Sequence, residues 1–254
     1  MTVALRTSPG QLAALLDPAL LRELRSHQLS EHGRIETGAT VLEVGAGTGQ
    51  VTTHLAGLVG PTGTVIAVDR DSSRLNPIGT SDVQARDLDR QVLPGGENSC
   101  DYVVARWPYG ALREPEDVLD QLLLRLRVGG LLVLADIPAT RPEIYAAPDG
   151  ESAELIRHVM RQVYTAVMGE DGTWTAALET MRARRGLAPC VHRTVETWTG
   201  GSAGCRLLAD IAADLYPIID VTGDDAEQFD GLMRDPRVRF GSFTSRIIQA
   251  RNTS

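Results

Sequence analysis

An acidic residue and three glycines alternate over positions 43–49, where the sequence reads E-V-G-A-G-T-G. A short apolar run precedes them, and a segment with helical spacing follows. Glycines between a buried strand and a helix let the backbone approach a ligand closely and direct the helix N-terminus at it. The carboxylate of Glu43 suits a ligand with an ammonium group, because opposite charges attract. The pattern therefore predicts a binding loop for a ligand that carries a positive charge.

Two classes of ligand use a glycine loop at the carboxyl ends of parallel strands. The dinucleotide fingerprint is G-x-G-x-x-G, with the pyrophosphate above the helix. Read from Gly45, its third glycine falls on Gln50. A carboxylate such as that of Glu43 is also badly placed beside a pyrophosphate. A nicotinamide oxidoreductase is therefore the less favoured interpretation.

Several segments, in order along the chain, resemble the motifs of class I S-adenosylmethionine (SAM)-dependent methyltransferases. They are LEVGAGTG, AVDRD at 67–71, RDLDR at 86–90, CDYVVAR ending at Arg106, and LRVGGLLVLADI. The resemblance runs from about residue 12 to the C-terminus, and the tail is similar to a small-molecule branch common in actinobacteria. It implies SAM as cofactor, S-adenosylhomocysteine (SAH) as product, and a small-molecule acceptor such as a specialised metabolite or its precursor.

The resemblance also implies which residues hold the methionine and ribose parts of SAM. Glu43, directly or through water, would hold the methionine part. The backbone of Gly45, Ala46 and Gly47 would complete that contact. Asp69 ends the second expected strand. A carboxylate there would accept charge-assisted hydrogen bonds from both ribose hydroxyls.

For the adenine and the methyl donor, the resemblance points to residues further along the chain. Arg70 would pack along the adenine face. Asp87 would accept a hydrogen bond from the adenine amino group, with Asp89 as a competing candidate. Leu88 would pack against the adenine ring. Arg106 would lie beside the methyl donor.

The sequence does not single out a general base, and SAM needs none because its methyl group is already activated. Relatives often carry a His shortly after the fourth strand, but Ala111 stands there in this chain. We expect aromatic side chains near the carboxyl end of the sheet to form the acceptor pocket by stacking or cation–π attraction. The weak candidates for a base are His158, Tyr164, His27 and His32, and the pocket candidates are Trp107, Tyr109, Tyr164 and Trp174. A non-methylating cyclase of the same fold stays open as an alternative.

Composition excludes several other functions. All 25 basic residues are Arg, so Schiff-base chemistry and a P-loop lysine are ruled out. The net charge of −8 argues against binding nucleic acid. The three cysteines and five histidines show no metal-ligand spacing, so we expect no metal. We expect a cytoplasmic monomer or homodimer without a membrane contact, because there is neither a leader peptide nor an apolar run of about 18 residues.

Short apolar runs alternate with helical patterns, which predicts an α/β fold: a Rossmann-like, seven-stranded, mostly parallel sheet with helices on both faces. We expect strands at 40–45, 64–69, 82–86, 101–106, 131–137, 189–198 and 237–250, and helices at 49–58, 115–127, 151–168, 174–185 and after 200. The chain is predicted to be one domain, 1–254. Its parts would be N-terminal helices (1–37), a SAM-binding core (38–137), a helical lid insertion (138–186) and the C-terminal part of the sheet (187–254).

Overall fold

The computed structural model describes most of the chain from residue 35 onward. The described residues are 21, 35–69, 75, 79, 81–86, 90–106, 115–138, 140–168 and 187–253. The N-terminal helices predicted in 1–37 and the helix predicted at 174–185 therefore lie largely or wholly outside the described residues.

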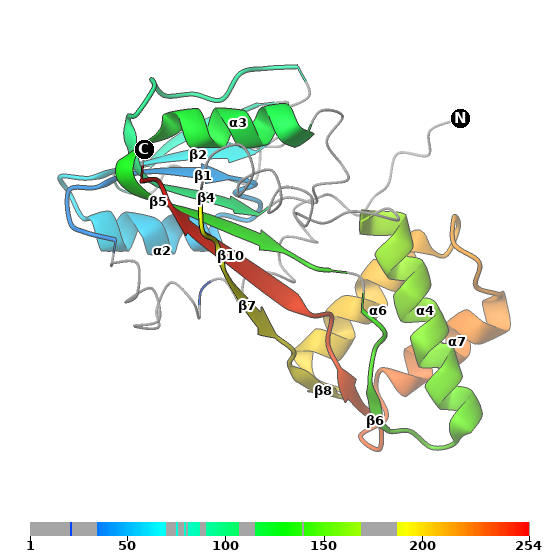
Figure 1. The fold of residues 1–254 in the computed structure, drawn as a ribbon. Coiled ribbons are helices and arrows are strands. Elements are labelled where there is room, and N and C mark those ends of the chain that lie inside the picture. Colours follow the sequence, from blue (N-terminus) through cyan, green and yellow to red (C-terminus); the bar gives the residue numbers. More distant parts are fainter. Residues whose placement is uncertain are drawn as a thin grey trace.

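A seven-stranded sheet forms the centre of the protein (Figure 1). The strand order is β3-β2-β1-β4-β5-β10-β7, and the first five strands are parallel. β10 runs antiparallel to both of its neighbours. This confirms the predicted Rossmann-like, mostly parallel sheet. The strands are β1 (Thr40–Val44), β2 (Thr64–Asp69), β3 (Ser81–Ala85), β4 (Cys100–Arg106), β5 (Leu126–Asp136), β7 (Cys190–Thr194) and β10 (Ser245–Arg251).

Among the described residues, the helices α2 and α3 lie on opposite faces of the parallel part of this sheet, as Figure 1 shows. α2 (Gln50–Val59) buries Val51 and Leu55 against the side chains of Val41 and Val104. α3 (Pro115–Arg125) packs on the opposite face, in a cluster with alternate residues of the same strands. Period-2 alternation along β1 and β4 places successive side chains on opposite faces, so both faces of these strands are buried.

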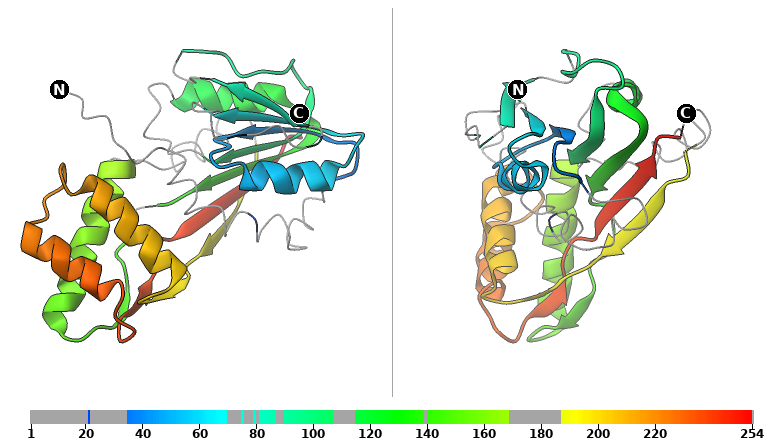
Figure 2. Two further views of the ribbon diagram at one scale, coloured as in Figure 1. Left: turned by 180° about the vertical axis from the view of Figure 1, so that it is seen from behind. Right: turned by 90° about the vertical axis from the view of Figure 1, so that its left-hand side faces the viewer.

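A second body lies beyond the carboxyl ends of β5 and β7, and the views of Figure 2 show it from two further sides. We call it the cap and define it as residues 144–168 and 197–241. Its three helices contact one another, and its three-stranded antiparallel sheet has the order β6-β9-β8. Its elements are β6 (Ile144–Ala146), α4 (Gly150–Met168), β8 (Thr197–Thr199), α6 (Ala203–Leu215), α7 (Gly223–Leu232) and β9 (Arg239–Gly241).

The cap has an apolar interior of its own that is continuous with one face of the large sheet. Ile156 and Met160 of α4 are fully buried beside Ile211 of α6 and Phe229 of α7. Trp198 meets Phe240 edge to face, with ring centroids 6.0 Å apart. Burial of this kind stabilises the cap as a folded unit rather than as a loose segment.

Among the described residues, three of the segments between the cap and the sheet (137–143, 195–196 and 242–244) are hydrogen-bonded to one another. The backbone N–H of Gly241 donates to Glu143 O at 2.8 Å, and that of Ser242 donates to Glu196 O at 2.7 Å. The hydroxyls of Thr140 and Thr244 are 3.0 Å apart. These cross-links hold the three connections side by side.

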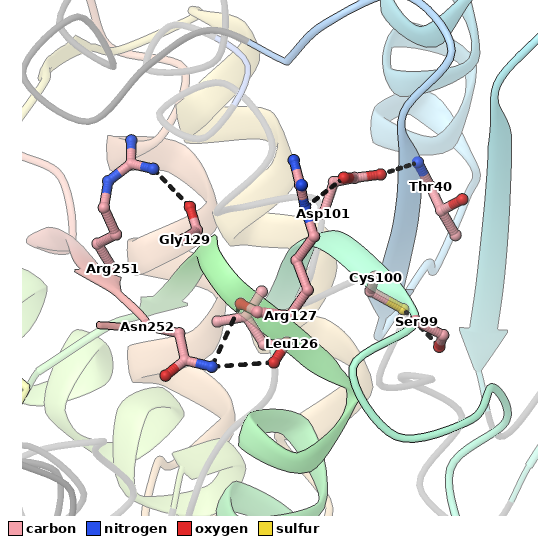
Figure 3. A network of polar contacts seen from close by, with 9 residues as sticks. All are labelled: Thr40, Ser99, Cys100, Asp101, Leu126, Arg127, Gly129, Arg251 and Asn252. Atoms are coloured by element: carbon pink, nitrogen blue, oxygen red, sulfur yellow. Dashed lines mark hydrogen bonds and ion pairs between the residues drawn. The ribbon is translucent and has the colours of Figure 1, made fainter. Parts of the chain in front are cut away.

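The opposite end of the sheet is closed by the polar contacts drawn in Figure 3. Asp101 Oδ2 accepts from the backbone N–H of Thr40 at 2.7 Å, and its other oxygen pairs with Arg127 at 2.5 Å. The Asn252 side chain donates to the carbonyl oxygens of Leu126 and Arg127 at 3.0 and 3.2 Å. The C-terminal strand is thereby fastened to the start of β5.

Several predicted boundaries differ from the structure. The helix predicted at 115–127 ends at Arg125, and residues 126–130 begin β5 through a bulge. The strands predicted at 189–198 and 237–250 are each broken, because β8 and β9 leave the large sheet and pair in the cap. Residues 197–241 therefore lie with α4 in the cap, whereas the sequence pattern predicts all of 187–254 as part of the large sheet. β6 and α7 were not predicted.

Candidate functional site

The glycine loop joins the end of β1 to the start of α2. Gly45, Gly47 and Gly49 have φ values of 79°, 56° and 80°, which other residues adopt only with strain. The backbone N–H groups of Gly45 and Ala46 donate to Val68 O at 2.8 and 3.1 Å. The sequence therefore folds here into a bare loop that is tied to the end of the neighbouring strand β2.

Asp69 is the last residue of β2 and is almost fully buried. Its Oδ2 accepts a hydrogen bond from the backbone N–H of Gly47 at 2.8 Å. Parallel pairing of Val44 with Val68 places this carboxylate beside the loop. A fixed carboxylate at this place suits the binding of vicinal hydroxyls.

Glu43 and Arg106 form a buried ion pair beneath the loop. Both side chains are 0% exposed, and Oε1 of Glu43 is 3.3 Å from a terminal nitrogen of Arg106. The guanidinium also donates from Nε to Gly45 O at 2.6 Å and from its terminal nitrogen to Ala46 O. The structure thus brings together the predicted residues Glu43, Gly45, Ala46 and Arg106, with Arg106 in contact with the loop carbonyls themselves.

A second buried ion pair lies at the same end of the sheet. Arg246 of β10 is directly opposite Asp136 of β5 in the antiparallel register, and its Nε donates to Asp136 Oδ1 at 2.8 Å. A second contact joins the terminal nitrogen of Arg246 to Asp136 Oδ2. The neighbours Ile248 and Leu134 belong to the α3 side of the sheet, so alternation places this pair there. Glu43 and Arg106 lie on the α2 side by the same rule, beside Val41 and Val104.

Tyr164 of α4 reaches the carboxyl end of β5. Its hydroxyl donates to Ile137 O at 3.0 Å, and its ring centroid is 6.4 Å from that of Phe243. The structure therefore places this predicted pocket residue at the junction between the cap and the sheet. Phe243, which precedes β10, was not predicted; its aromatic ring in the tail was the available signal.

His158 has a different environment within the cap. Its Nε2 is 2.6 Å from Asp220 O and donates a hydrogen bond to it, since a carbonyl oxygen only accepts. Its Nδ1 is 3.3 Å from a terminal nitrogen of Arg161. These contacts tie α4 to the segment between α6 and α7, and they engage both ring nitrogens.

The remaining predicted site residues lie outside the described residues. For the cofactor they are Arg70, Asp87 and Leu88; for the acceptor pocket, Trp107, Tyr109 and Trp174; and for a base, His27 and His32. Their proposed roles stay predictions.

Within the described ranges, the structure contains no group of three or more His, Cys, Asp or Glu residues arranged to hold a metal ion. Asp136, an acid near the end of β5, is engaged by Arg246. The prediction that no metal is needed remains to be tested.

No helix in the described part of the chain is long and apolar enough to cross a membrane.

Comparison with known proteins shows which sequences this chain is similar to. Residues 13–180 match the sequence profile of a methyltransferase domain. The ubiquinone/menaquinone biosynthesis C-methyltransferase UbiE of Pseudomonas savastanoi pv. phaseolicola is 33% identical over 110 residues, which are 40% of this chain and 43% of that protein. UbiE of Hahella chejuensis is 30% identical over 125 residues, 45% of this chain and 50% of that protein. The matches thus span about half the length of these curated relatives, or less.

Solved structures share the fold. A candidate methyltransferase of Bacillus halodurans aligns with a TM-score of 0.58 at 16% identity, covering 89% of this chain and 98% of that one. A cyclopropane-fatty-acyl-phospholipid synthase-like protein of Lactobacillus casei aligns with a TM-score of 0.54 at 13% identity, covering 96% of this chain and 100% of that one. The sequence profile covers more than half of the chain and includes the glycine loop, Asp69 and Arg106. The chain therefore belongs to the class I SAM-dependent methyltransferase family.

Proposed function

We propose that this protein transfers the methyl group of SAM to a small-molecule acceptor. The observation that carries the proposal is the glycine loop between β1 and α2, bound by Asp69 on one side and lying above buried Glu43 on the other. In this arrangement a carboxylate and backbone carbonyls suit the methionine ammonium, and Asp69 suits the ribose hydroxyls. Arg70, Asp87 and Leu88 complete the proposed site at the adenine.

For methyl transfer, the main task of the protein is to align SAM and the acceptor. When bound, SAM would supply a methyl group that its sulfonium already activates for attack by the acceptor atom, with SAH as the other product. Holding both reactants at near-attack distance removes much of the entropic barrier. Excluding water strengthens the electrostatic interactions in the site. No side chain needs to form a covalent intermediate.

We propose that the acceptor binds between the glycine loop and the cap. Tyr164 and Phe243 supply aromatic surface where the cap meets the carboxyl end of β5. The predicted pocket residues Trp107, Tyr109 and Trp174 would add to it. Residues 138–186 were predicted to form the lid, and the contacts of α4 with α6 and α7 favour a cover that also includes residues 197–241.

The curated relatives support a narrower choice of acceptor. They are named C-methyltransferases of ubiquinone and menaquinone biosynthesis. We therefore favour a carbon atom of a hydroxylated aromatic ring as the nucleophile, which is narrower than the specialised metabolite that the sequence resemblance implies. The net charge of −8 supports a small molecule over nucleic acid. Cytoplasmic location and a monomeric or homodimeric state stay predictions.

An acceptor screen tests the proposal. The purified protein is incubated with SAM and separate panels of hydroquinones, phenols and amines, and mass spectrometry records SAH and any product heavier by one methyl group. We expect SAH and methylated hydroquinone in equal amounts. The control is the Gly47→Val variant, whose branched side chain would occupy the ligand's space. A product that has gained no methyl group, formed while SAM is bound but not consumed, would instead favour the non-methylating cyclase.

A further inference from the structure

The Glu43 carboxylate and two loop carbonyls form a site that binds a cation, and in the structure that cation is Arg106. The guanidinium contacts Glu43 Oε1 at 3.3 Å, Gly45 O at 2.6 Å, and Ala46 O. One negative charge and two carbonyl dipoles thus converge on a single side chain. Such a set of acceptors is not specific for guanidinium and would suit any buried cation of similar reach.

The strand pairing explains why Arg106 reaches this place. Val44 of β1 pairs with Ala105 of β4, so the next residues, Gly45 and Arg106, follow at the carboxyl ends of the two strands. Arg106 is only 2% exposed, so its charge is withdrawn from water together with that of Glu43. Removing one partner of such a buried pair would leave the other charge uncompensated, which is costly. Arg106 therefore stabilises the loop in the conformation described.

The same acceptors are those that the proposed function assigns to the methionine ammonium of SAM. Two positive charges a few ångströms apart repel each other, and the single negative charge of Glu43 cannot neutralise both. The guanidinium and the ammonium therefore exclude each other from this set of acceptors. One of them must leave when the other arrives.

We propose that Arg106 is an internal place-holder for the cofactor's ammonium group and is displaced from the loop carbonyls when SAM or SAH binds. This inference rests on the proposed function. Before the cofactor binds, Arg106 neutralises Glu43 and donates hydrogen bonds to the loop carbonyls. After binding, the ammonium group of the cofactor makes these contacts instead. The apparent affinity for the cofactor is then the intrinsic affinity multiplied by the fraction of protein in which Arg106 has left the loop carbonyls. Arg106 is then a positioning residue that also tunes affinity.

Calorimetry on the Arg106→Met variant tests this inference, because methionine fills much of the same space without a charge. We expect SAH to bind about 5-fold more tightly or better, since the competing cation is gone and the ammonium now compensates Glu43. An SAH analogue without the α-amino group should show no such gain. The melting temperature of the variant without ligand should fall.

Arg125→Met is the matched control. Arg125 is also a buried arginine that donates to backbone carbonyls, those of Leu93 and Pro94, but it lies at the end of α3 away from the glycine loop. Its substitution should lower the melting temperature and leave the SAH affinity within about 2-fold. A gain in affinity in Arg125→Met as large as that in Arg106→Met would show a general effect of destabilisation and overturn the inference.

Other outcomes separate this inference from the proposed function. Weaker or unchanged binding of SAH by Arg106→Met would overturn the place-holder role alone. If that variant does not fold, Arg106→Lys should give a smaller gain of the same sign. A crystal structure of the wild-type protein with SAH gives an answer without any variant: Arg106 still hydrogen-bonded to Gly45 O would contradict displacement. Failure of the wild-type protein to bind SAH would remove the proposed function, and this inference with it.

Discussion

The carboxylate of Asp69 accepts a hydrogen bond from the backbone N–H of Gly47, with 2.8 Å between Oδ2 and the nitrogen. This contact links the end of β2 to the middle of the glycine loop. The residue that we propose for the ribose hydroxyls therefore also shapes the loop that we propose for the methionine part. A change at Asp69 should affect both parts of the cofactor site.

We predict that Asp69→Asn and Asp69→Ala weaken SAH binding to different extents. Asparagine keeps an oxygen for Gly47 N–H but loses the charge, whereas alanine loses both. Losing a charged acceptor costs about 1.5–3 kcal/mol, so alanine should weaken binding by at least about 10-fold and asparagine by less. Calorimetric titration with SAH measures both. Equal affinity in all three proteins would show that Asp69 does not contact the cofactor.

Tyr164 should affect the acceptor and not the cofactor. We predict that Tyr164→Ala lowers acceptor turnover at least about 10-fold, or about 1.4 kcal/mol, with SAH affinity nearly unchanged. Tyr164→Phe should retain most of the turnover. The Tyr164 hydroxyl donates a hydrogen bond to Ile137 O, so we assign it a structural role and not that of a base. Steady-state kinetics and SAH calorimetry on the two variants check this. A loss of turnover in Tyr164→Phe equal to that in Tyr164→Ala would instead assign a catalytic task to the hydroxyl.

Gly200 should be essential for the stability of the cap. A β-carbon at Gly200 would lie 1.9 Å from Asp235 O, so Gly200→Ala forces the backbone apart. We expect it to lower the free energy of unfolding by about 1–3 kcal/mol or more. Gly231 in α7 is the control, since a β-carbon there meets no atom within 4 Å. Gly231→Ala should be neutral or stabilising by up to about 1 kcal/mol. Urea denaturation that ranks the two variants in the reverse order would contradict the described packing.

The three cysteines should differ in their reaction with iodoacetamide. Burial raises the pKa of the Cys100 and Cys205 thiols, so at pH 8 they hold less of the reactive thiolate than an ordinary thiol does. Cys190 is partly exposed on β7 and should be labelled first. Labelling of Cys100 and Cys205 should accelerate as the pH rises, or when the protein is unfolded in urea. Peptide mapping by mass spectrometry follows each thiol, and rapid labelling of native Cys100 would be inconsistent with its burial.

Local pattern was sufficient to predict the parallel strands and the glycine loop. The apolar runs before Gly45 and Asp69 are long enough, and their ends sharp enough, to place β1 and β2 within a residue. The proposed contact of Glu43 with a cation was also predictable from charge alone. The partner it has in the structure was not, because Arg106 comes from a strand whose position depends on the order of the sheet.

Features that depend on long-range pairing could not be predicted. The contact between Asp136 and Arg246 joins residues 110 positions apart through an antiparallel register. The pattern at 189–198 alternates throughout, so only the three-dimensional course of the chain shows that it is shared between two sheets. α7 is a different case: Thr222 caps it and Asp225 stands in its first turn, which are local signals for a helix start. Attention to the cap residue would have found it.

Calorimetric titration of the wild-type protein with SAH, and separately with NADH, tests the central claim most directly. We predict saturable binding of one SAH per chain and no comparable binding of NADH, because the glycine loop lies above Glu43 and ends in Gln50 rather than in a third fingerprint glycine. Preferential binding of NADH, or no binding of SAH by folded protein, would contradict a SAM site at the ends of β1, β2 and β4.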